Sequence, residues 1–378
     1  MIKIRDFFQS NKFATISSWL VGLVFIFSGF VKGVDPLGFA YKIEDYFIAF
    51  GQSWANDLAL ILAISLCTIE FTIGMALLLK AKTRLTSWVL LIVMLFFTVL
   101  TFNDALYSPV PDCGCFGDAL KLTNWQTFYK NIVLMIFTVI VFYNRNRFKS
   151  YFSGKVQNRW YFLFVVGFVS FSMYNYRHLP LIDFTIWKEG KQITSDQPIE
   201  NKVYVKYVNT NTQEEKEFLS PDYPWNDSAW MKEWQFVGQR IVSLGTEIDH
   251  SLFIEDESGN EFTSEILLAS KMFVIVIPEI QVVKDEQLQK ILQFTKDLHI
   301  TDCQMVIITG SLANEIENLK KITGNQLDIY FADETVLKTI VRSNPGIILF
   351  NDGRLIKKWH FNDFPSISEI PDLSKVLN

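Results

Sequence analysis

Two cysteines separated by one glycine, Cys113 and Cys115, are the residues whose types and spacing best suit chemistry. Thiolates are the nucleophiles of disulfide exchange and soft ligands for metals. Gly114 lets the backbone between them adopt angles that other residues avoid. A disulfide across so short a loop would be strained, and strained disulfides are readily reduced. The pair therefore suggests redox chemistry, with a structural disulfide, two unpaired thiols or a metal site as alternatives.

The composition predicts a membrane part followed by a soluble part. Hydrophobic residues make up 49% of the 378 residues, and the mean hydropathy is +0.19. The apolar excess lies in the first half, whereas residues 188–270 are polar and acidic. A bilayer span needs roughly 20 apolar residues. Five apolar runs are candidates for spans: 13–34, 58–79, 88–106, 128–143 and 160–176.

Lysines and arginines in the short loops predict the orientation of these spans. They gather in the N-terminal tail, after the second run and after the fourth run. The positive-inside rule then places the N-terminus in the cytoplasm of a multi-pass protein of the inner membrane. With five spans, the cysteine loop and the chain after residue 176 both lie outside, where disulfides persist. The net charge of −5 argues against nucleic acid as a partner, leaving membrane lipid and exported proteins.

Three ionisable residues fall within or at the ends of the apolar runs. Glu70 lies near the middle of the second run and should face the bundle interior with a partner, because a carboxylate is costly in lipid. Asp104 ends the third run, just before the cysteine loop. Glu70 and Asp104 suit either a buried contact that fixes helix register or a proton or quinone site. Lys32 is expected to extend toward the outer headgroups.

The first half resembles the DoxX and MauE membrane families. The resemblance covers about residues 13–145 and rests on Phe27-Ser28-Gly29-Phe30-Val31-Lys32, Asp35-Pro36, Glu70 with Gly74, and the Cys-Gly-Cys-Phe-Gly loop. It implies a four-helix membrane protein tied to thiol, sulfur and quinone redox chemistry. For MauE it implies making or maintaining disulfides of an exported partner. Cys113 and Cys115 would be the redox pair, and Lys32 and Glu70 the polar residues within the membrane.

The exported part divides at about residue 265. Residues 183–265 show short strand-like runs and an aromatic loop whose tryptophans, Trp225, Trp230 and Trp234, suit a core better than a partner surface. After 266, strands and helices alternate. The expected strands are 271–277, 304–308 and 327–331, the expected helices are 285–298, 314–322 and 334–341, and a hairpin covers 346–359. This order predicts an α/β arrangement on a mostly parallel sheet.

That order resembles the thioredoxin fold of TlpA-like proteins, with Asn344-Pro345 ahead of the hairpin. In that family the proline is cis and lies beside a Cys-x-x-Cys. The corresponding stretch here, 277–281, has no cysteine, and Cys303 is expected to be idle. The resemblance therefore implies a redox-dead domain kept for binding, with Asn344 and Pro345 contacting the partner.

Together these features predict a membrane all-α helical bundle followed by an exported α/β part. The expected domains are a four-helix membrane domain (1–150), a fifth span (151–182), a β-rich segment (183–265) and a thioredoxin-like domain (266–378). The predicted function is electron exchange between exported thiols and the membrane through the cysteine loop, with a quinone as acceptor and no metal. The alternative is a non-enzymatic assembly protein whose cysteines form a structural clip.

Overall fold

The computed structural model describes residues 11–364, except 111, 194–199, 211, 213, 221, 225–226, 228–229, 245–251, 299–302, 318 and 321–326. The chain divides into two compact units. The first comprises Met1–Lys188 together with Leu337–Ile347 and Trp359–Pro365, and the second comprises Glu189–Val336, Ile348–Lys358 and Ser366–Asn378.

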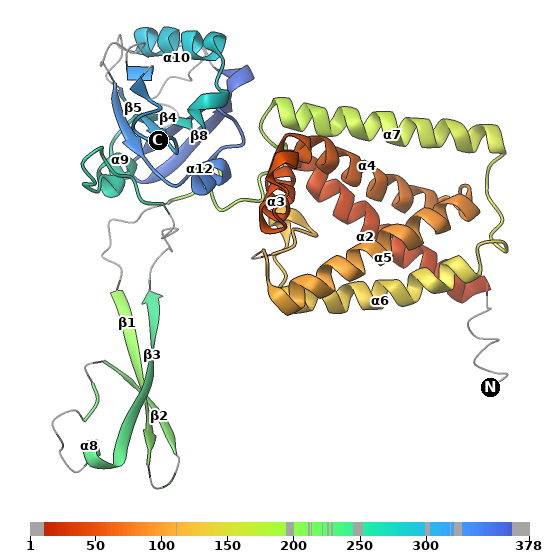
Figure 1. The fold of residues 1–378 in the computed structure, drawn as a ribbon, viewed down its shortest axis with the longest axis horizontal. Helices are drawn as coiled ribbons and strands as arrows, with labels where there is room; N and C mark the ends of the chain where they lie inside the picture. Colours follow the sequence, from red (N-terminus) through yellow and green to blue (C-terminus); the bar gives the residue numbers. More distant parts are fainter. Residues whose placement is uncertain are drawn as a thin grey trace. The chain divides into compact units, whose positions relative to one another are not determined.

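Long apolar helices form the first unit (Figure 1). They are α2 (Asn11–Val34), α3 (Pro36–Ala49), α4 (Ala59–Leu78), α5 (Thr83–Tyr107), α6 (Asn124–Tyr143) and α7 (Gly154–Arg177), with short 3₁₀ turns η1 (Ser53–Leu58) and η2 (Gly117–Ala119). Among the described residues, four helices are long and apolar enough to cross a membrane: Lys12–Val34, Ser53–Leu78, Thr83–Tyr107 and Asn124–Tyr143. Large apolar side chains such as Ile92 and Val99 remain exposed on them, as expected for a surface that faces lipid. These helices fit a multi-pass membrane protein.

Glycines bring α2 and α4 into close contact. A Cβ atom on Gly29 would lie 2.8 Å from the backbone nitrogen of Phe71, and one on Gly74 would lie 2.6 Å from the carbonyl oxygen of Gly22. Only glycine fits where two helix backbones approach this closely. The crossing sets one face of α2 directly against the middle of α4, where Glu70 lies.

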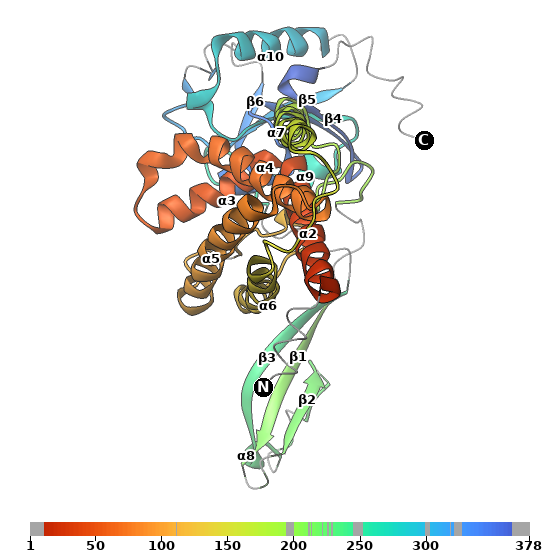
Figure 2. The same cartoon turned by 90° about the vertical axis from the view of Figure 1, so that its right-hand side faces the viewer.

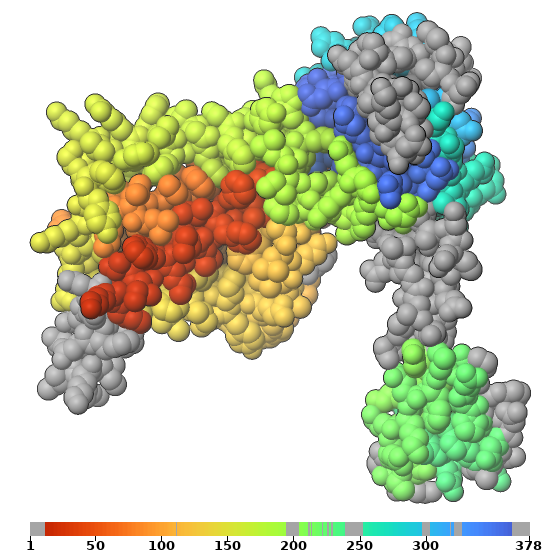
Figure 3. All heavy atoms as spheres, turned by 180° about the vertical axis from the view of Figure 1, so that it is seen from behind, coloured from red at the N-terminus to blue at the C-terminus, as the bar shows by residue number. Residues whose placement is uncertain are grey.

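The helix α7 extends along the bundle beside α4 (Figures 1 and 2). Near its start, Gln157 accepts a hydrogen bond from the backbone of Lys82, in the turn between α4 and α5. Farther along, the Phe168 ring stacks on Phe71 at 4.4 Å and closes over Gly33 at the end of α2. In the space-filling view, α2 (red) lies between α7 and the chain around the cysteine loop (Figure 3). Although α7 has 24 residues, it is not among the four membrane-spanning candidates, so the fifth span stays a prediction.

The second unit contains a three-stranded sheet of order β2-β1-β3. Its strands are β1 (Glu200–Asn209), β2 (Glu215–Leu219) and β3 (Trp234–Leu244), with the short helix α8 (Trp230–Glu233) before β3. The rings of Trp230 and Trp234 stack at 5.6 Å and pack around the buried Tyr207. The predicted core role is confirmed for these two tryptophans, while Trp225 lies outside the described residues.

A five-stranded sheet of order β6-β5-β4-β7-β8 follows. Its elements are α9 (Thr263–Leu268), β4 (Met272–Ile277), η3 (Ile280–Val282), α10 (Asp285–Leu298), β5 (Gln304–Thr309), β6 (Asp328–Phe331), α12 (Glu334–Ile340), β7 (Gly346–Asn351), β8 (Arg354–His360) and η4 (Phe361–Asp363). β4, β5 and β6 pair in parallel, and every residue of β4 is buried, as the apolar run predicted. The predicted helix at 314–322 extends outside the described residues.

Candidate functional site

The cysteine loop connects α5 to α6 through a tight turn. Gly114 and Gly117 adopt φ angles of +62° and +52°, a region that residues with a side chain rarely enter. The amide of Gly117 donates to the Gly114 carbonyl at 3.0 Å, and the carboxylate of Asp112 accepts from the Gly114 amide at 3.0 Å. This turn brings the Sγ atoms of Cys113 and Cys115 within 2.8 Å of each other, each half-buried.

Lys32 and Glu70 form a buried ion pair between α2 and α4. The Nζ–Oε1 distance is 2.6 Å, and the two side chains are 2% and 3% exposed. The expectation that Glu70 faces the interior with a partner is confirmed. The expectation that Lys32 extends toward the headgroups is wrong, because the attraction of Glu70 and the ring of Phe39, 4.6 Å from Nζ, hold the ammonium inside.

Ser28 connects this ion pair to the cysteine loop. Its hydroxyl oxygen lies 2.9 Å from Oε2 of Glu70 and 2.8 Å from the carbonyl oxygen of Cys115. A hydroxyl has one proton, so Ser28 donates to one of these acceptors at a time. The serine occurs one helical turn before Lys32, and this spacing places both side chains on the same face of α2.

The two thiols differ in acidity. The hydrogen bond from Cys113 and the positive charges of Lys130 and Lys32 lower the pKa of Cys115, while burial opposes them, and together these effects bring the pKa to about 6. The hydrogen bond to Cys115 and burial raise the pKa of Cys113. The ammonium of Lys130 lies 4.4 Å from the centre of the Phe116 ring, beside the turn. At neutral pH the reduced pair therefore carries its negative charge on Cys115.

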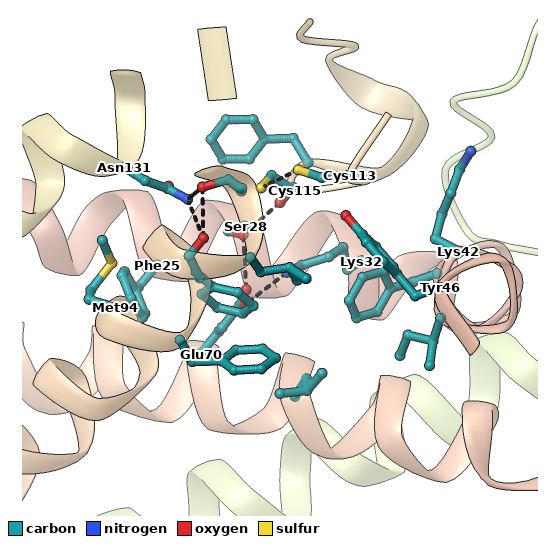
Figure 4. A pocket seen from close by; sticks show the side chains of 18 of the residues that line it. Phe25, Ser28, Lys32, Lys42, Tyr46, Glu70, Met94, Cys113, Cys115 and Asn131 are labelled. Carbon is teal, nitrogen blue, oxygen red and sulfur yellow. Dashed lines mark hydrogen bonds and ion pairs between the residues drawn. The ribbon is translucent and has the colours of Figure 1, made fainter. Parts of the chain in front are cut away.

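Both pairs of residues line one largely apolar cavity of about 440 Å³ (Figure 4). This volume is within the range of small-molecule sites, roughly 300–1,000 Å³. Its polar lining consists of Ser28, Lys32, Lys42, Tyr46, Glu70, Thr101, Cys113, Cys115, Lys130 and Asn131. The aromatic lining comes from Phe25, Phe39, Phe47, Phe50, Phe96, Phe97 and Phe116. The cavity thus places a dithiol, an ion pair and several hydrogen-bond donors around an apolar space.

Asp104 reaches this cavity through Tyr46. The Tyr46 hydroxyl donates to Oδ2 of Asp104 at 2.6 Å, while Oδ1 of Asp104 is buried with no hydrogen-bond partner in the described structure. Burial and the bond to Asp104 raise the pKa of Tyr46, so the phenol keeps its proton. Sequence patterns did not single out Tyr46, because an aromatic residue in an amphipathic segment is as readily a packing residue.

The structure brings together four of the residues selected from sequence, namely Cys113, Cys115, Lys32 and Glu70. Asn344 and Pro345 do not line the cavity, although the peptide bond between them is cis, as the resemblance implied. Sequence reasoning also missed Lys130 of α6, whose positive charge lowers the pKa of Cys115. Lysines are common near the ends of membrane spans, so a lysine near the start of an apolar run does not indicate a functional site.

Comparison with known families recognises the part of the chain that holds this site. Residues 10–144 match the family of the methylamine utilisation protein MauE. The match to MauE covers α2 to α6 with the cysteine loop and ends before α7. No curated protein and no solved structure matched the chain.

Proposed function

We propose that this chain is a membrane thiol–disulfide oxidoreductase that passes electrons from exported thiols to a membrane quinone. One observation carries the proposal: the Cys113–Cys115 pair and the Lys32–Glu70 ion pair line the same apolar cavity. The match of residues 10–144 to the family of the methylamine utilisation protein MauE supports a membrane accessory role for this region, and the resemblance to DoxX proteins points the same way.

The exchange step begins with the oxidised cysteine pair. A thiolate of the exported partner attacks the sulfur of Cys113 and the disulfide breaks, releasing Cys115 as a thiolate. Cys115 is the better leaving group because its pKa is lowered to about 6. The partner's second thiol then attacks the mixed disulfide and releases Cys113. The partner has lost two electrons and two protons, and the cysteine pair has gained them.

The cavity residues suit a quinone as the second substrate. A quinone is an apolar ring with two carbonyl oxygens, and it supplies an acceptor for two electrons and two protons. The cavity offers aromatic walls, Lys32 as a hydrogen-bond donor, and the Tyr46 hydroxyl, which Asp104 holds in place. The Ser28 hydroxyl donates to the Glu70 carboxylate or to the carbonyl oxygen of Cys115, and the Lys32 ammonium stabilises the Cys115 thiolate. The two thiols of the reduced pair return to the disulfide by giving two electrons and two protons to the quinone, which would leave as the quinol.

We also propose five spans, with the N-terminus in the cytoplasm of an inner membrane. The contacts of α7 support this, because Gln157 bonds to the α4–α5 turn and Phe168 closes over Gly33 at the end of α2. A helix with contacts at both ends of the bundle crosses the same layer as its neighbours. The chain after α7 is then on the same side as the cysteine loop, outside the cytoplasm.

For the part of the chain that contains the five-stranded sheet we propose a thioredoxin-like domain that binds rather than reduces. The strand order β6-β5-β4-β7-β8 and the parallel β4–β5 pair support this fold. Residues 277–281, after β4, contain no cysteine, so a dithiol is missing from the usual place. Asn344 and Pro345 would contact the exported partner.

The test is to trap the partner and to follow the redox state of the loop in cells. With Cys115→Ser, the thiolate of the remaining Cys113 attacks the disulfide of an oxidised exported partner, in the reverse of the exchange step. The mixed disulfide should accumulate, because Cys115, which would resolve it, is missing. Cys113→Ser is the matched control and should trap much less. In the unaltered chain, alkylation-shift analysis should find a partly reduced pair that becomes more reduced when quinone is depleted. A pair that stays oxidised under all conditions would favour the structural clip.

A further inference from the structure

Arg342 is a buried arginine bound to two carboxylates within the first unit. Its side chain is 6% exposed, Nε donates to Oδ2 of Asp35 at 2.8 Å, and Nη2 donates to Oδ2 of Asp118 at 2.9 Å. The remaining terminal nitrogen, Nη1, donates to the carbonyl oxygen of Lys338. All three guanidinium nitrogens are therefore engaged, which fixes the plane of the group.

Charged and closely packed residues surround the Arg342 guanidinium. Burial lowers the pKa of Arg342, but Asp35 and Asp118 raise it more, so the group stays charged. The ring of Tyr41 lies 5.9 Å from Cζ. At Gly38 an added Cβ would lie 2.7 Å from Nη2 of Arg342 and 2.3 Å from Asp35. A buried charge with a close-fitting site is costly to form and strongly disrupted when one partner is lost.

The two carboxylates belong to the segments that carry the redox site. Asp35 caps the start of α3 by accepting from the Gly38 amide at 2.9 Å, and it follows Lys32 by three residues. Asp118 lies in η2, three residues after Cys115. Arg342 thus connects the end of the cysteine loop to the helix junction beside the Lys32 ammonium.

We propose that Arg342 is a positioning residue for the cysteine loop. By holding η2 against the start of α3, it keeps Cys115 next to Ser28 and Lys32 at the cavity. The catalytic consequence rests on the proposed thiol–disulfide function, whereas the positioning itself does not. Without Arg342 the cysteine loop opens and Cys115 moves away from the Lys32 ammonium. The Cys115 thiolate then becomes more accessible to solvent and loses the stabilisation by that positive charge.

The experiment measures site-resolved alkylation of the reduced full-length chain in lipid vesicles, together with the reduction potential of the pair. Arg342→Gln and Asp118→Asn should each raise the alkylation rate of Cys115 roughly threefold or more at saturating pH, and the double variant should show little further increase, because neighbours in one network do not act additively. Arg342→Lys should restore the slow rate only in part, since an ammonium does not span both carboxylates as a guanidinium does. Lys121→Gln is the control, because Lys121 also neighbours Asp118 but is 71% exposed.

The outcomes separate the two proposals. Unchanged Cys115 alkylation and unchanged potential in both single variants would overturn the role of Arg342, whatever their turnover. If Arg342→Gln fails to accumulate, Asp118→Asn decides, because it leaves the Arg342–Asp35 pair in place. A chain that exchanges no disulfides at all, yet responds as expected in alkylation, would contradict the proposed function and support the positioning role.

Discussion

Lys32 and Glu70 are charged side chains that are almost fully buried, and each neutralises the charge of the other. Removing one partner leaves an uncompensated buried charge, a loss of roughly 3–5 kcal/mol, whereas replacing both with apolar residues is often nearly neutral. This asymmetry distinguishes a structural role from a chemical one. If the pair only joined α2 to α4, a double apolar replacement would leave the redox function intact.

We predict that Glu70→Met lowers accumulation of the chain strongly, while the double variant Lys32→Met with Glu70→Met accumulates near the level of the unaltered chain. The double variant should still reoxidise its cysteine pair much more slowly, because Cys115 has lost a stabilising charge and Ser28 has lost a proton acceptor. Quantified membrane fractions and alkylation-shift time courses measure the two effects. Normal reoxidation in the double variant would assign the pair a purely structural role.

The acidity of Cys115 gives a second prediction at the scale of single residues. Alkylation of Cys115 in the reduced chain should increase as pH rises through about 6, far below the ordinary thiol value of 9.0. Below that pH the thiolate is protonated and the rate falls. Lys130→Gln should move the midpoint upward by removing a nearby positive charge, and Lys121→Gln should leave it unchanged. A midpoint near 9 in the unaltered chain would contradict the assignment of Cys115 as the thiolate.

At the scale of elements, the site depends on the close crossing of α2 and α4. Ser28 and Lys32 meet Glu70 because Gly29 and Gly74 leave room for the two backbones. Glycines within apolar runs do not reveal from sequence alone which helix they contact, so this crossing was not predictable in detail.

We predict that Gly74→Ala destabilises the bundle by about 1–3 kcal/mol, as overpacking of a tight contact does. The added methyl group would meet the Gly22 carbonyl oxygen at 2.6 Å. Gly167→Ala is the matched control, because no atom lies within 4 Å of a Cβ built on that helical glycine of α7. There we expect no loss, and a gain of about 0.4–1 kcal/mol from reduced freedom of the unfolded chain. Thermal unfolding in detergent compares the two variants, and equal destabilisation would contradict the crossing.

Sequence patterns predicted much of the element order and only part of the site. The apolar runs correspond to α2, α4, α5 and α6, and the run at 271–277 to the buried strand β4, because hydrophobic length and periodicity are local properties. The cysteine pair could also be recognised from the sequence, because its two members are separated by one residue. The Lys32–Glu70 contact, the donor Tyr46 and the influence of Lys130 depend on which helices are neighbours, and a single sequence does not specify that.

In the whole molecule, the chain after α7 should be on the same side of the membrane as the cysteine loop, because α7 is proposed to be a fifth span. Single cysteines placed at Lys121, Lys149 and Lys188, in a background with Cys67, Cys113, Cys115 and Cys303 all replaced by serine, test this with an impermeant maleimide. All three positions are exposed. We expect labelling of intact cells at Lys121 and Lys188, and labelling at Lys149 only after permeabilisation. If the cysteine at position 188 is protected while the cysteine at position 121 is labelled, α7 does not cross the membrane.

Anaerobic reoxidation in proteoliposomes tests whether the Cys113–Cys115 pair passes its electrons to a quinone in the cavity. The full-length chain is reduced, freed of reductant and mixed with a membrane quinone, and disulfide formation and quinol absorbance are followed together. We predict one quinol for each Cys113–Cys115 disulfide formed, with no quinol from the Cys115→Ser variant and slow formation when Tyr46 is replaced by phenylalanine. A pair that remains reduced beside excess quinone, in protein shown to be folded, would contradict the account.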